Sequence, residues 1–314
     1  MVMILLELSF IMDKKKEGIA LFITLMVIAS IMSIIAVSFS YLEKVQKDAG
    51  TTSAIIQGDL LYNNTIEVLK RFFPAKSDNS DKLEIIYTMP LSLSEPKSGF
   101  NINLSCEPLM VGAPISWLDR QQTKLVPEKT SLAKDILEHI MEIYDIENPN
   151  RLEEMILQSV TGRTLENIEY EPRLQPKKGT ISKKQFKNII IDYFLLYDDP
   201  KVLTVPWEKY FSFVKIDKTT KIDGTYLSPE FISVAFDIPI EIIQDSWIIG
   251  ESTLSSFLKE NGISTVINKK IYANKALNAM HCEQSYLYQD KQYKFNFNYI
   301  EGRSSNFEFN GEER

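Results

Sequence analysis

The sequence has few histidines and cysteines. It has only two histidines, His139 and His281, and neither stands at a spacing typical of a metal ligand or a general base. His281 precedes Cys282, but neighbouring residues of a strand point to opposite faces, so the two do not form a thiol and base pair. The common motifs of hydrolases, zinc proteases, phosphate loops and dinucleotide-binding folds do not occur either. We expect no enzyme activity.

Dense positive charge is also scarce. The chain has 35 basic and 42 acidic residues, which gives a formal net charge of −7. Beyond the N-terminal region, no run of Lys and Arg alternates with aromatic residues in the way that nucleic-acid binding requires. We therefore do not expect the protein to bind nucleic acid.

Long apolar runs are rare too, with one exception near the N-terminus. Residues 19–42 contain no charged side chain, and a helix needs about 20 apolar residues to cross a bilayer. A signal peptide has a shorter apolar core of about 7–15 residues. Lys14, Lys15 and Lys16 precede the run, so the N-terminus should stay cytoplasmic and the rest should be exported. By this pattern alone, the run is an ordinary membrane anchor.

The residues around the start of the apolar run indicate more than an anchor. The sequence "KKKEG", which ends at Gly18, followed by "IALFITLMVIAS" resembles the leader of type IV pilins and type II secretion pseudopilins. This resemblance implies that prepilin peptidase cleaves after Gly18 and that Ile19 becomes the N-methylated first residue. Met12 would start a leader of ordinary length. Residues 1–11 are then an overextended start, or a second short apolar segment that Glu7 interrupts.

One departure from the pilin pattern narrows the resemblance. Most pilins have a glutamate at the fifth mature position, where this chain has Ile23. In the family, that glutamate is thought to pair with the N-terminal amine of a neighbouring subunit. The chain is similar to the K-type minor pseudopilin, which is the largest member and typically lacks this glutamate. The resemblance implies a subunit at the filament tip.

The order of expected elements agrees with this resemblance. Helical periodicity continues after the apolar run and stops at Pro74, with a weak point expected at Gly50. The fold class expected is α+β: a pilin-like N-terminal spine helix packed on a small antiparallel sheet, with a large, mainly helical domain inserted between strands. The expected parts are the leader (1–18), the membrane-spanning and exported halves of the spine (19–42 and 43–75), the first part of the sheet domain (76–129), the helical insertion (130–262) and the second part of the sheet domain (263–314).

Local patterns support these parts. We expect strands over 82–94 and 99–109, and a strand in which Tyr293, Phe295, Phe297 and Tyr299 share one face. The expected helix starts are Asn150 with Glu153, Ser182 with Gln185, Ser228 with Pro229, and Asp237 with Pro239, and one helix should end at Gly262.

The two cysteines, Cys106 and Cys282, stand just before and just after the insertion. In an exported domain they could form a disulfide that joins the two ends of the insertion, which is our prediction. The alternative is that both are small buried apolar residues.

The family resemblance also implies calcium sites in the exported domain. Asp217, Asp223 and Glu230 are the acidic loop residues to consider first, and Asp78 and Asp81 form a second set. The alternative is that each loop is a solvated turn. No cofactor is otherwise expected.

These inferences predict a single-pass inner-membrane protein with a cytoplasmic N-terminus and a periplasmic domain. The resemblance implies that it works at the pseudopilus tip in type II secretion. Its partners would be I- and J-type minor pseudopilins, prepilin peptidase, the inner-membrane assembly platform and membrane lipid. The alternatives are a minor pilin of a type IV pilus and a signal-anchored periplasmic binding protein.

Overall fold

The computed structural model describes the backbone of residues 2–75, 77–95, 100–121, 123–124, 126–162, 182–214, 220–263, 267–289 and 291–312. Side chains before Leu25, and a few later ones, are not described. The chain divides into two compact units, Met1–Asp59 and Leu60–Arg314.

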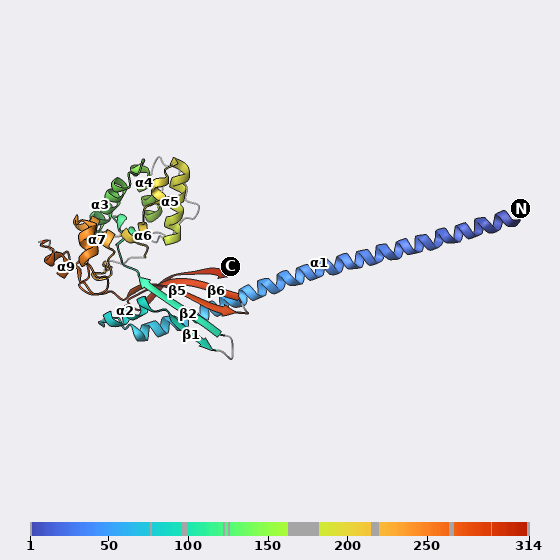
Figure 1. The fold of residues 1–314 in the computed structure, drawn as a ribbon, viewed down its shortest axis with the longest axis horizontal. Helices are drawn as coiled ribbons and strands as arrows, with labels where there is room; N and C mark the ends of the chain where they lie inside the picture. The colour runs from blue at the N-terminus through green and yellow to red at the C-terminus, as the bar shows by residue number, and fades with distance from the viewer. Residues whose placement is uncertain are drawn as a thin grey trace. The chain divides into compact units, whose positions relative to one another are not determined.

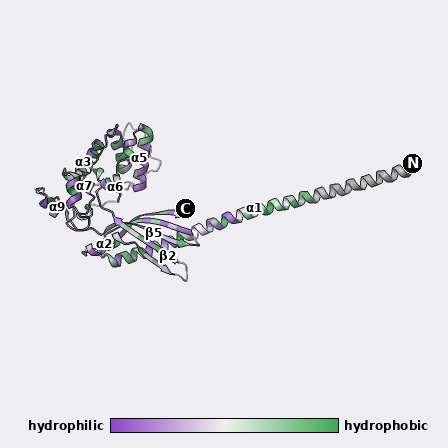
Figure 2. Ribbon diagram, viewed as in Figure 1, coloured by the Kyte–Doolittle hydropathy of each residue, from purple (hydrophilic) through white to green (hydrophobic). Residues whose placement is uncertain are grey.

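The first unit consists of one helical segment, part of α1, which spans Val2–Phe72. The helix is continuous through Gly50, so the weak point expected there is absent. Glycine lowers helix stability by roughly 1 kcal/mol, which the long helical stretches on either side outweigh. Figure 2 shows the apolar character of the described part nearest the N-terminus.

The second unit begins with the last turns of α1, which end at Phe72, two residues before Pro74. Proline cannot donate a backbone hydrogen bond, so the helix ends before it. Lys70 and Arg71 in the last turn stabilise this end, because their positive charges interact favourably with the negative end of the helix dipole. Leu61, Ile66 and Leu69 are buried. These turns are the C-terminal end of the spine helix that the sequence predicts.

A five-stranded antiparallel sheet lies in this unit, in the order β1-β2-β5-β6-β7 (Figure 1). The alternation predicted for the C-terminal part is confirmed, because Tyr293, Phe295, Phe297 and Tyr299 are all buried. Tyr62 of α1 stacks edge-on against Phe297, with ring centroids 5.3 Å apart. The strands are β1 (Leu91–Glu95), β2 (Phe100–Pro108), β5 (Ala279–Tyr288), β6 (Lys291–Ile300) and β7 (Arg303–Glu312).

The strand expected over 82–94 is wrong in its first half. Ser80–Thr88 forms a helix, α2, and only Leu91–Glu95 is a strand. Leu83 and Ile86, three residues apart, are buried on one side of α2. This helical spacing was hidden by the strand-forming residues Ile, Tyr and Thr around it. The first part of the sheet domain therefore contains a helix as well as two strands.

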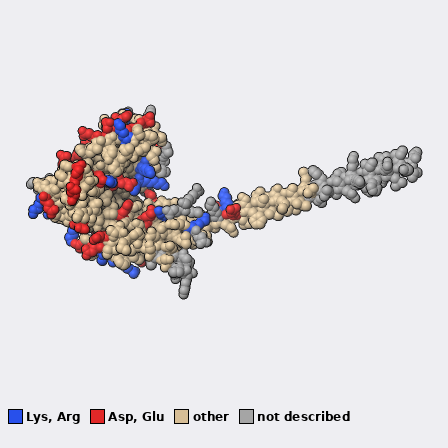
Figure 3. All heavy atoms as spheres, viewed as in Figure 1, with Lys and Arg blue, Asp and Glu red and all other residues tan. Residues whose placement is uncertain are grey.

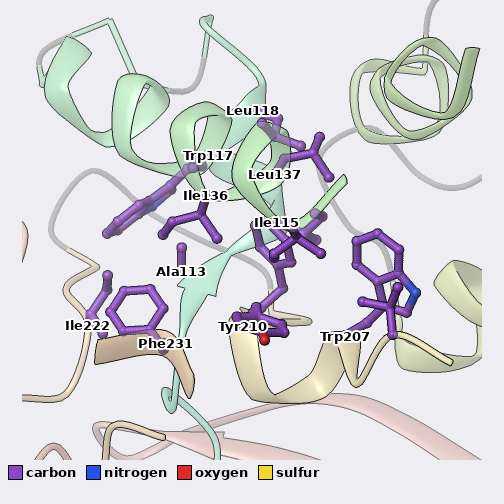
Figure 4. Close-up of a cluster of buried hydrophobic side chains, with 14 of the residues drawn as sticks. Ala113, Ile115, Trp117, Leu118, Ile136, Leu137, Trp207, Tyr210, Ile222 and Phe231 are labelled. Carbon is purple, nitrogen blue, oxygen red and sulfur yellow. The ribbon is translucent and has the colours of Figure 1, made fainter. Parts of the chain in front are cut away.

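The inserted domain is mainly helical, as the sequence predicts (Figure 1). A two-stranded parallel sheet of β3 and β4 runs through it. Its core packs Trp117 and Ile115 against helix residues such as Ile136 and Phe231 (Figure 4). The elements are β3 (Ala113–Pro114), η1 (Ile115–Leu118), α3 (Pro127–Ile143), α4 (Pro149–Thr161), α5 (Lys183–Tyr197), η2 (Pro200–Leu203), α6 (Trp207–Tyr210), β4 (Phe211–Ser212), α7 (Pro229–Phe236), α8 (Ile240–Ser246) and α9 (Leu254–Glu260).

Two of the four predicted helix starts are confirmed. Ser182 and Gln185 form a complete capping box at α5, and the hydroxyl of Ser228 accepts a hydrogen bond from the amide of Phe231 at α7. Gly262 has a φ of +72°, as expected for the residue after a helix end.

The other two predicted starts are wrong. Helix α4 begins at Pro149, one residue before Asn150, with Asn148 at its N-cap. Asp237 is the left-handed C-cap of α7, and the N-cap of α8 is Pro239. In both places the fixed φ of proline suits it to the helix start, and the polar residue nearby takes another position.

Candidate functional site

The apolar part of α1 is the first functional feature of the molecule. The described residues contain one helix that is long and apolar enough to cross a membrane, by length and composition. Three of its hydroxyl groups are satisfied within the helix: those of Ser30, Ser33 and Ser38 donate to the carbonyls four residues earlier, at 2.8–2.9 Å. Such pairing suits a lipid environment, where unpaired polar groups are costly.

The leader residues belong to the same helix in the backbone description. Their side chains lie outside the described part of the structure. The structure therefore does not test the predictions for Lys14, Lys15, Lys16, Gly18, Ile19 and Ile23. Cleavage after Gly18, methylation of Ile19 and the role of Ile23 therefore stay predictions.

The last turns of α1 have two apolar faces. One face, with Leu61 and Leu69, is buried, while Leu60, Val68 and Phe72 are exposed. Leu60, Val68 and Phe72 belong to one row of residues spaced by four, with Asn64 between Leu60 and Val68, and this row winds around the helix by about 120° from Leu60 to Phe72. We call these three residues the outer stripe. A second apolar face on a helix already packed by its first face is typical of a helix that contacts another protein.

The disulfide between Cys106 and Cys282 is confirmed. The two residues face each other directly on the paired strands β2 and β5, with Cα atoms 4.1 Å apart. Just beyond them, the amide of Leu109 donates to the carbonyl of Ala279 at 3.1 Å. The two chain segments that enter and leave the insertion are thus side by side, and the disulfide joins them at the sheet.

Asp223 lies at the same junction and is fully engaged there. Its carboxylate accepts hydrogen bonds from the amides of Thr225 at 2.7 Å, Tyr226 at 3.1 Å and Leu277 at 2.6 Å. Its own amide donates to Met110. Asp223 therefore connects the inserted domain to both chain segments that join it to the sheet. We call the place where these two segments meet the sheet the junction.

Burial raises the pKa of Asp223 to about 6, because the surrounding protein disfavours the charged carboxylate, while the three amide donors act in the opposite direction. Burial and the charge of Asp223 raise the pKa of the Tyr87 hydroxyl well above its ordinary value. Tyr87, from α2, stacks edge-on with Tyr226 at 5.0 Å and donates to the carbonyl of Ala279 at 3.2 Å. Helix α2 thereby also contacts the junction.

The acidic residues considered for calcium do not form a shared cation site in the described part. Asp223 is occupied by backbone amides, and Glu230 pairs with the ammonium group of Lys209. Asp217 lies outside the described residues. Within the described residues, no group of three or more His, Cys, Asp or Glu side chains is placed to hold a metal ion. Calcium binding by Asp217, Asp223 and Glu230 therefore stays a prediction, and the existing partners of Asp223 and Glu230 speak against it.

The second acidic loop is held by an ion pair across the sequence. Asp78 contacts Lys275 at 2.6 Å and accepts a hydrogen bond from the hydroxyl of Ser80, and the bond to Lys275 is the main reason its pKa falls to about 2. The bond ties the start of α2 to the chain segment that leaves the insertion.

Neither histidine lies in a recognisable catalytic arrangement among the described residues. His139 is exposed on α3. The Nδ1 atom of His281 lies 2.7 Å from the side-chain oxygen of Asn298 on the neighbouring strand. His281 lines a cavity of about 300 Å³ between the sheet and the start of α5, where Lys183 pairs with Glu208 at 2.5 Å. The cavity is lined by basic and acidic side chains together, among them Lys187 and Glu107.

The fold matches a solved structure. One chain in the crystal structure of the GspK-GspI-GspJ complex from the enterotoxigenic Escherichia coli type 2 secretion system aligns with a TM-score of 0.53 at 10% identity. The alignment covers 82% of this chain and 98% of that chain. No family model and no curated protein matches the sequence. At this identity the match establishes the fold.

The match confirms the expected α+β, pilin-like fold, and it takes in more than the sheet. Because it covers 82% of this chain, it must include much of the inserted domain as well as the sheet. The shared fold therefore extends over both the sheet and the insertion. The role of Tyr87 is not visible in the sequence, because the segment that carries it is predicted to be a strand and the residues that it contacts are distant in the sequence.

Proposed function

We propose that this chain is a K-type minor pseudopilin that forms the tip of a periplasmic pseudopilus in a type II secretion system. The observation that carries the proposal is the fold match, which covers nearly the whole of a chain from a complex named for GspK, GspI and GspJ. The leader pattern ending at Gly18 supports the same class. The protein would act by assembly, with no catalytic step of its own.

The partners proposed are I- and J-type minor pseudopilins. The outer stripe of Leu60, Val68 and Phe72 supports this part, because each side chain is about half exposed or more and could be buried by a neighbouring helix. Ile23 in place of glutamate supports a position at the tip, where no further subunit needs to be stacked above. In this arrangement the complex starts the filament that moves substrates through the outer membrane.

The proposed location is the inner membrane, with the N-terminus in the cytoplasm. The basic residues Lys14, Lys15 and Lys16 before the apolar helix support this orientation. Prepilin peptidase and the assembly platform would act on the chain while its helix is in lipid. The second candidate, a minor pilin of a type IV pilus, shares the leader, whereas a signal-anchored binding protein would not be cut after Gly18.

Processing of the N-terminus tests the class. The full chain is expressed with and without a prepilin peptidase, extracted from membranes, and examined by intact mass and N-terminal sequencing. We expect an N-methylated Ile19 only when the peptidase is present, and a Gly18→Leu variant should remain uncut. A chain that stays uncut with active peptidase, or that begins near residue 40, would contradict the filament class.

A further inference from the structure

A group of exposed apolar side chains lies on the inserted domain. Ile143 at the end of α3, Leu195 and Leu196 in the last turn of α5, and Leu203 in η2 are 54%, 62%, 59% and 49% exposed. Other apolar residues of the same elements, such as Ile140 and Val202, are fully buried. We call the four exposed residues the distal patch.

Hydrogen bonds hold together the three segments that carry the distal patch. The amide of Glu147 donates to the Asp199 carboxylate at 2.9 Å, and the amide of Asn148 donates to the hydroxyl of Tyr193 at 3.1 Å. The ammonium group of Lys201 contacts Asp145 at 2.8 Å. The turn after α3 is therefore fixed against the end of α5 and against η2, so the apolar residues beside these bonds are presented from one rigid region.

This region lies at the end of the insertion away from the sheet (Figure 1). The start of α5 lines the cavity beside the sheet through Lys183 and Lys184, and the exposed leucines are the thirteenth and fourteenth residues of this helix. At 1.5 Å per residue, this places the leucines roughly 20 Å from the sheet-facing end. Green, apolar ribbon is visible there in Figure 2.

The surroundings of the distal patch are acidic. Glu142, Asp145, Glu147 and Asp198 are all exposed and belong to the same turn and helix ends. Two cations also lie in this region, and both are paired: Lys201 with Asp145, and Arg151, which is close enough to Tyr197 to interact with it, with Glu154. Figure 3 shows acidic side chains gathered along this end of the insertion. An apolar centre with a charged rim is the usual composition of a protein-binding surface.

We propose that the distal patch binds a polypeptide segment that presents apolar side chains flanked by Lys or Arg. The leucines would bury the apolar side chains, and the acidic rim would attract the basic ones and repel acidic segments. A second copy of this chain is disfavoured, because two acidic rims would face each other. Anionic lipid is disfavoured for the same reason. The inference does not depend on the position of the protein in a filament.

The size of the patch sets the expected strength of binding. Four exposed side chains form a small surface, so the complex should be weak and short-lived. Its affinity should fall as salt screens the charged rim, with a screening length of about 8 Å at physiological ionic strength. These properties suit a surface that meets passing segments in turn.

The test uses the full chain in nanodiscs of zwitterionic lipid, with empty nanodiscs as reference. The probe is a short helical peptide with leucine on one face and lysine on the other, and the comparison peptide has glutamate in place of lysine. The patch variant is Leu195→Gln, Leu196→Gln and Leu203→Gln. The matched control is Ile242→Gln, Ile248→Gln and Ile249→Gln, which changes three side chains that are 43–54% exposed around α8.

We expect the lysine peptide to bind the wild-type chain and the matched control equally, and to bind the patch variant at least tenfold more weakly. A rim variant, Glu142→Gln, Glu147→Gln and Asp198→Asn, should weaken binding and reduce its dependence on salt. Thermal unfolding should be unchanged in every variant, since all the altered side chains are exposed. The proposal is overturned if the patch variant and the matched control bind alike, if no binding exceeds that of empty nanodiscs, or if the glutamate peptide binds as well as the lysine peptide.

Discussion

The two ends of the helical insertion use their side chains in opposite ways. At the junction, the disulfide, Asp223 and Tyr87 satisfy one another or backbone groups, and little is left for an outside partner. At the distal end, Leu195 and Leu196 remain open to solvent. The contrast indicates that stability is concentrated where the insertion meets the sheet, and that the opposite end is available for binding.

The largest expected effect comes from breaking the disulfide at the junction. The bond closes a separation of 176 residues, and removing such a constraint from the unfolded chain should lower the free energy of unfolding by about 3–5 kcal/mol. The variant is Cys106→Ala with Cys282→Ala, compared with the oxidised wild type by urea unfolding. An unchanged midpoint would mean that the junction does not depend on the disulfide.

The fluorescence of the three tryptophans makes this comparison regional. Trp117, Trp207 and Trp247 all belong to the insertion, whereas the sheet contains none. Circular dichroism follows the whole chain. If the disulfide joins two parts that are each stable alone, its removal should shift the unfolding midpoint followed by tryptophan fluorescence less than the midpoint followed by circular dichroism.

Removal of the carboxylate at the junction should have the next largest effect. Asp223→Ala leaves two buried amides and one partly buried amide without their acceptor, which we expect to cost about 2–3 kcal/mol of unfolding free energy. The comparison variant is Glu230→Gln, which breaks a partly exposed ion pair and should cost less than about 1 kcal/mol. Equal losses in the two variants would remove Asp223 from the account.

Acid should affect stability through the same group. The pKa of Asp223 is about 6 in the folded chain, against about 3.9 for an ordinary Asp side chain, so the folded state binds the proton more tightly. Its contribution to stability is therefore complete below about pH 4 and is lost as the pH rises to about 6. The difference is at most about 3 kcal/mol. Unfolding by urea across this range should show the decline in the wild type and not in Asp223→Asn; parallel curves would contradict it.

The smallest effect is expected at the distal end. The change of Leu195 or Leu196 to Gln should alter the free energy of unfolding by no more than about 0.5 kcal/mol, because these side chains are already exposed. Leu137→Ala, at a fully buried position in the same domain, should cost about 2–5 kcal/mol. Similar losses at the two places would show that the distal leucines are part of the core in solution.

The sequence predicts well where a single local pattern decides the structure. The alternation from Tyr293 to Tyr299 specifies a strand with one buried face, and Ser182 with Gln185 specifies the start of α5. The order of sheet, helical insertion and sheet follows from such patterns. The positions of Cys106 and Cys282 at the two ends of the insertion favour a disulfide, but only the pairing of their strands distinguishes it from two buried thiols.

Long-range contacts explain what the sequence does not reveal. Asp223 accepts from Leu277, which is 54 residues away, so its role as a backbone anchor could not be distinguished from that of a loop carboxylate free for calcium. Helix α2 contains residues that favour strands, and its packing through Leu83 and Ile86 decides the outcome. The distal patch depends on which leucines of an apolar helix remain uncovered, which periodicity does not show.

The most direct test of the proposed function is native mass spectrometry of this chain co-expressed with an I-type and a J-type minor pseudopilin and extracted from membranes. We predict a complex with one copy of each, weakened by Leu60→Gln with Val68→Gln on the outer stripe and unaffected by Ile242→Gln with Ile248→Gln. Recovery of this chain alone, although the other two proteins associate with each other, would contradict the proposal that it is their K-type partner.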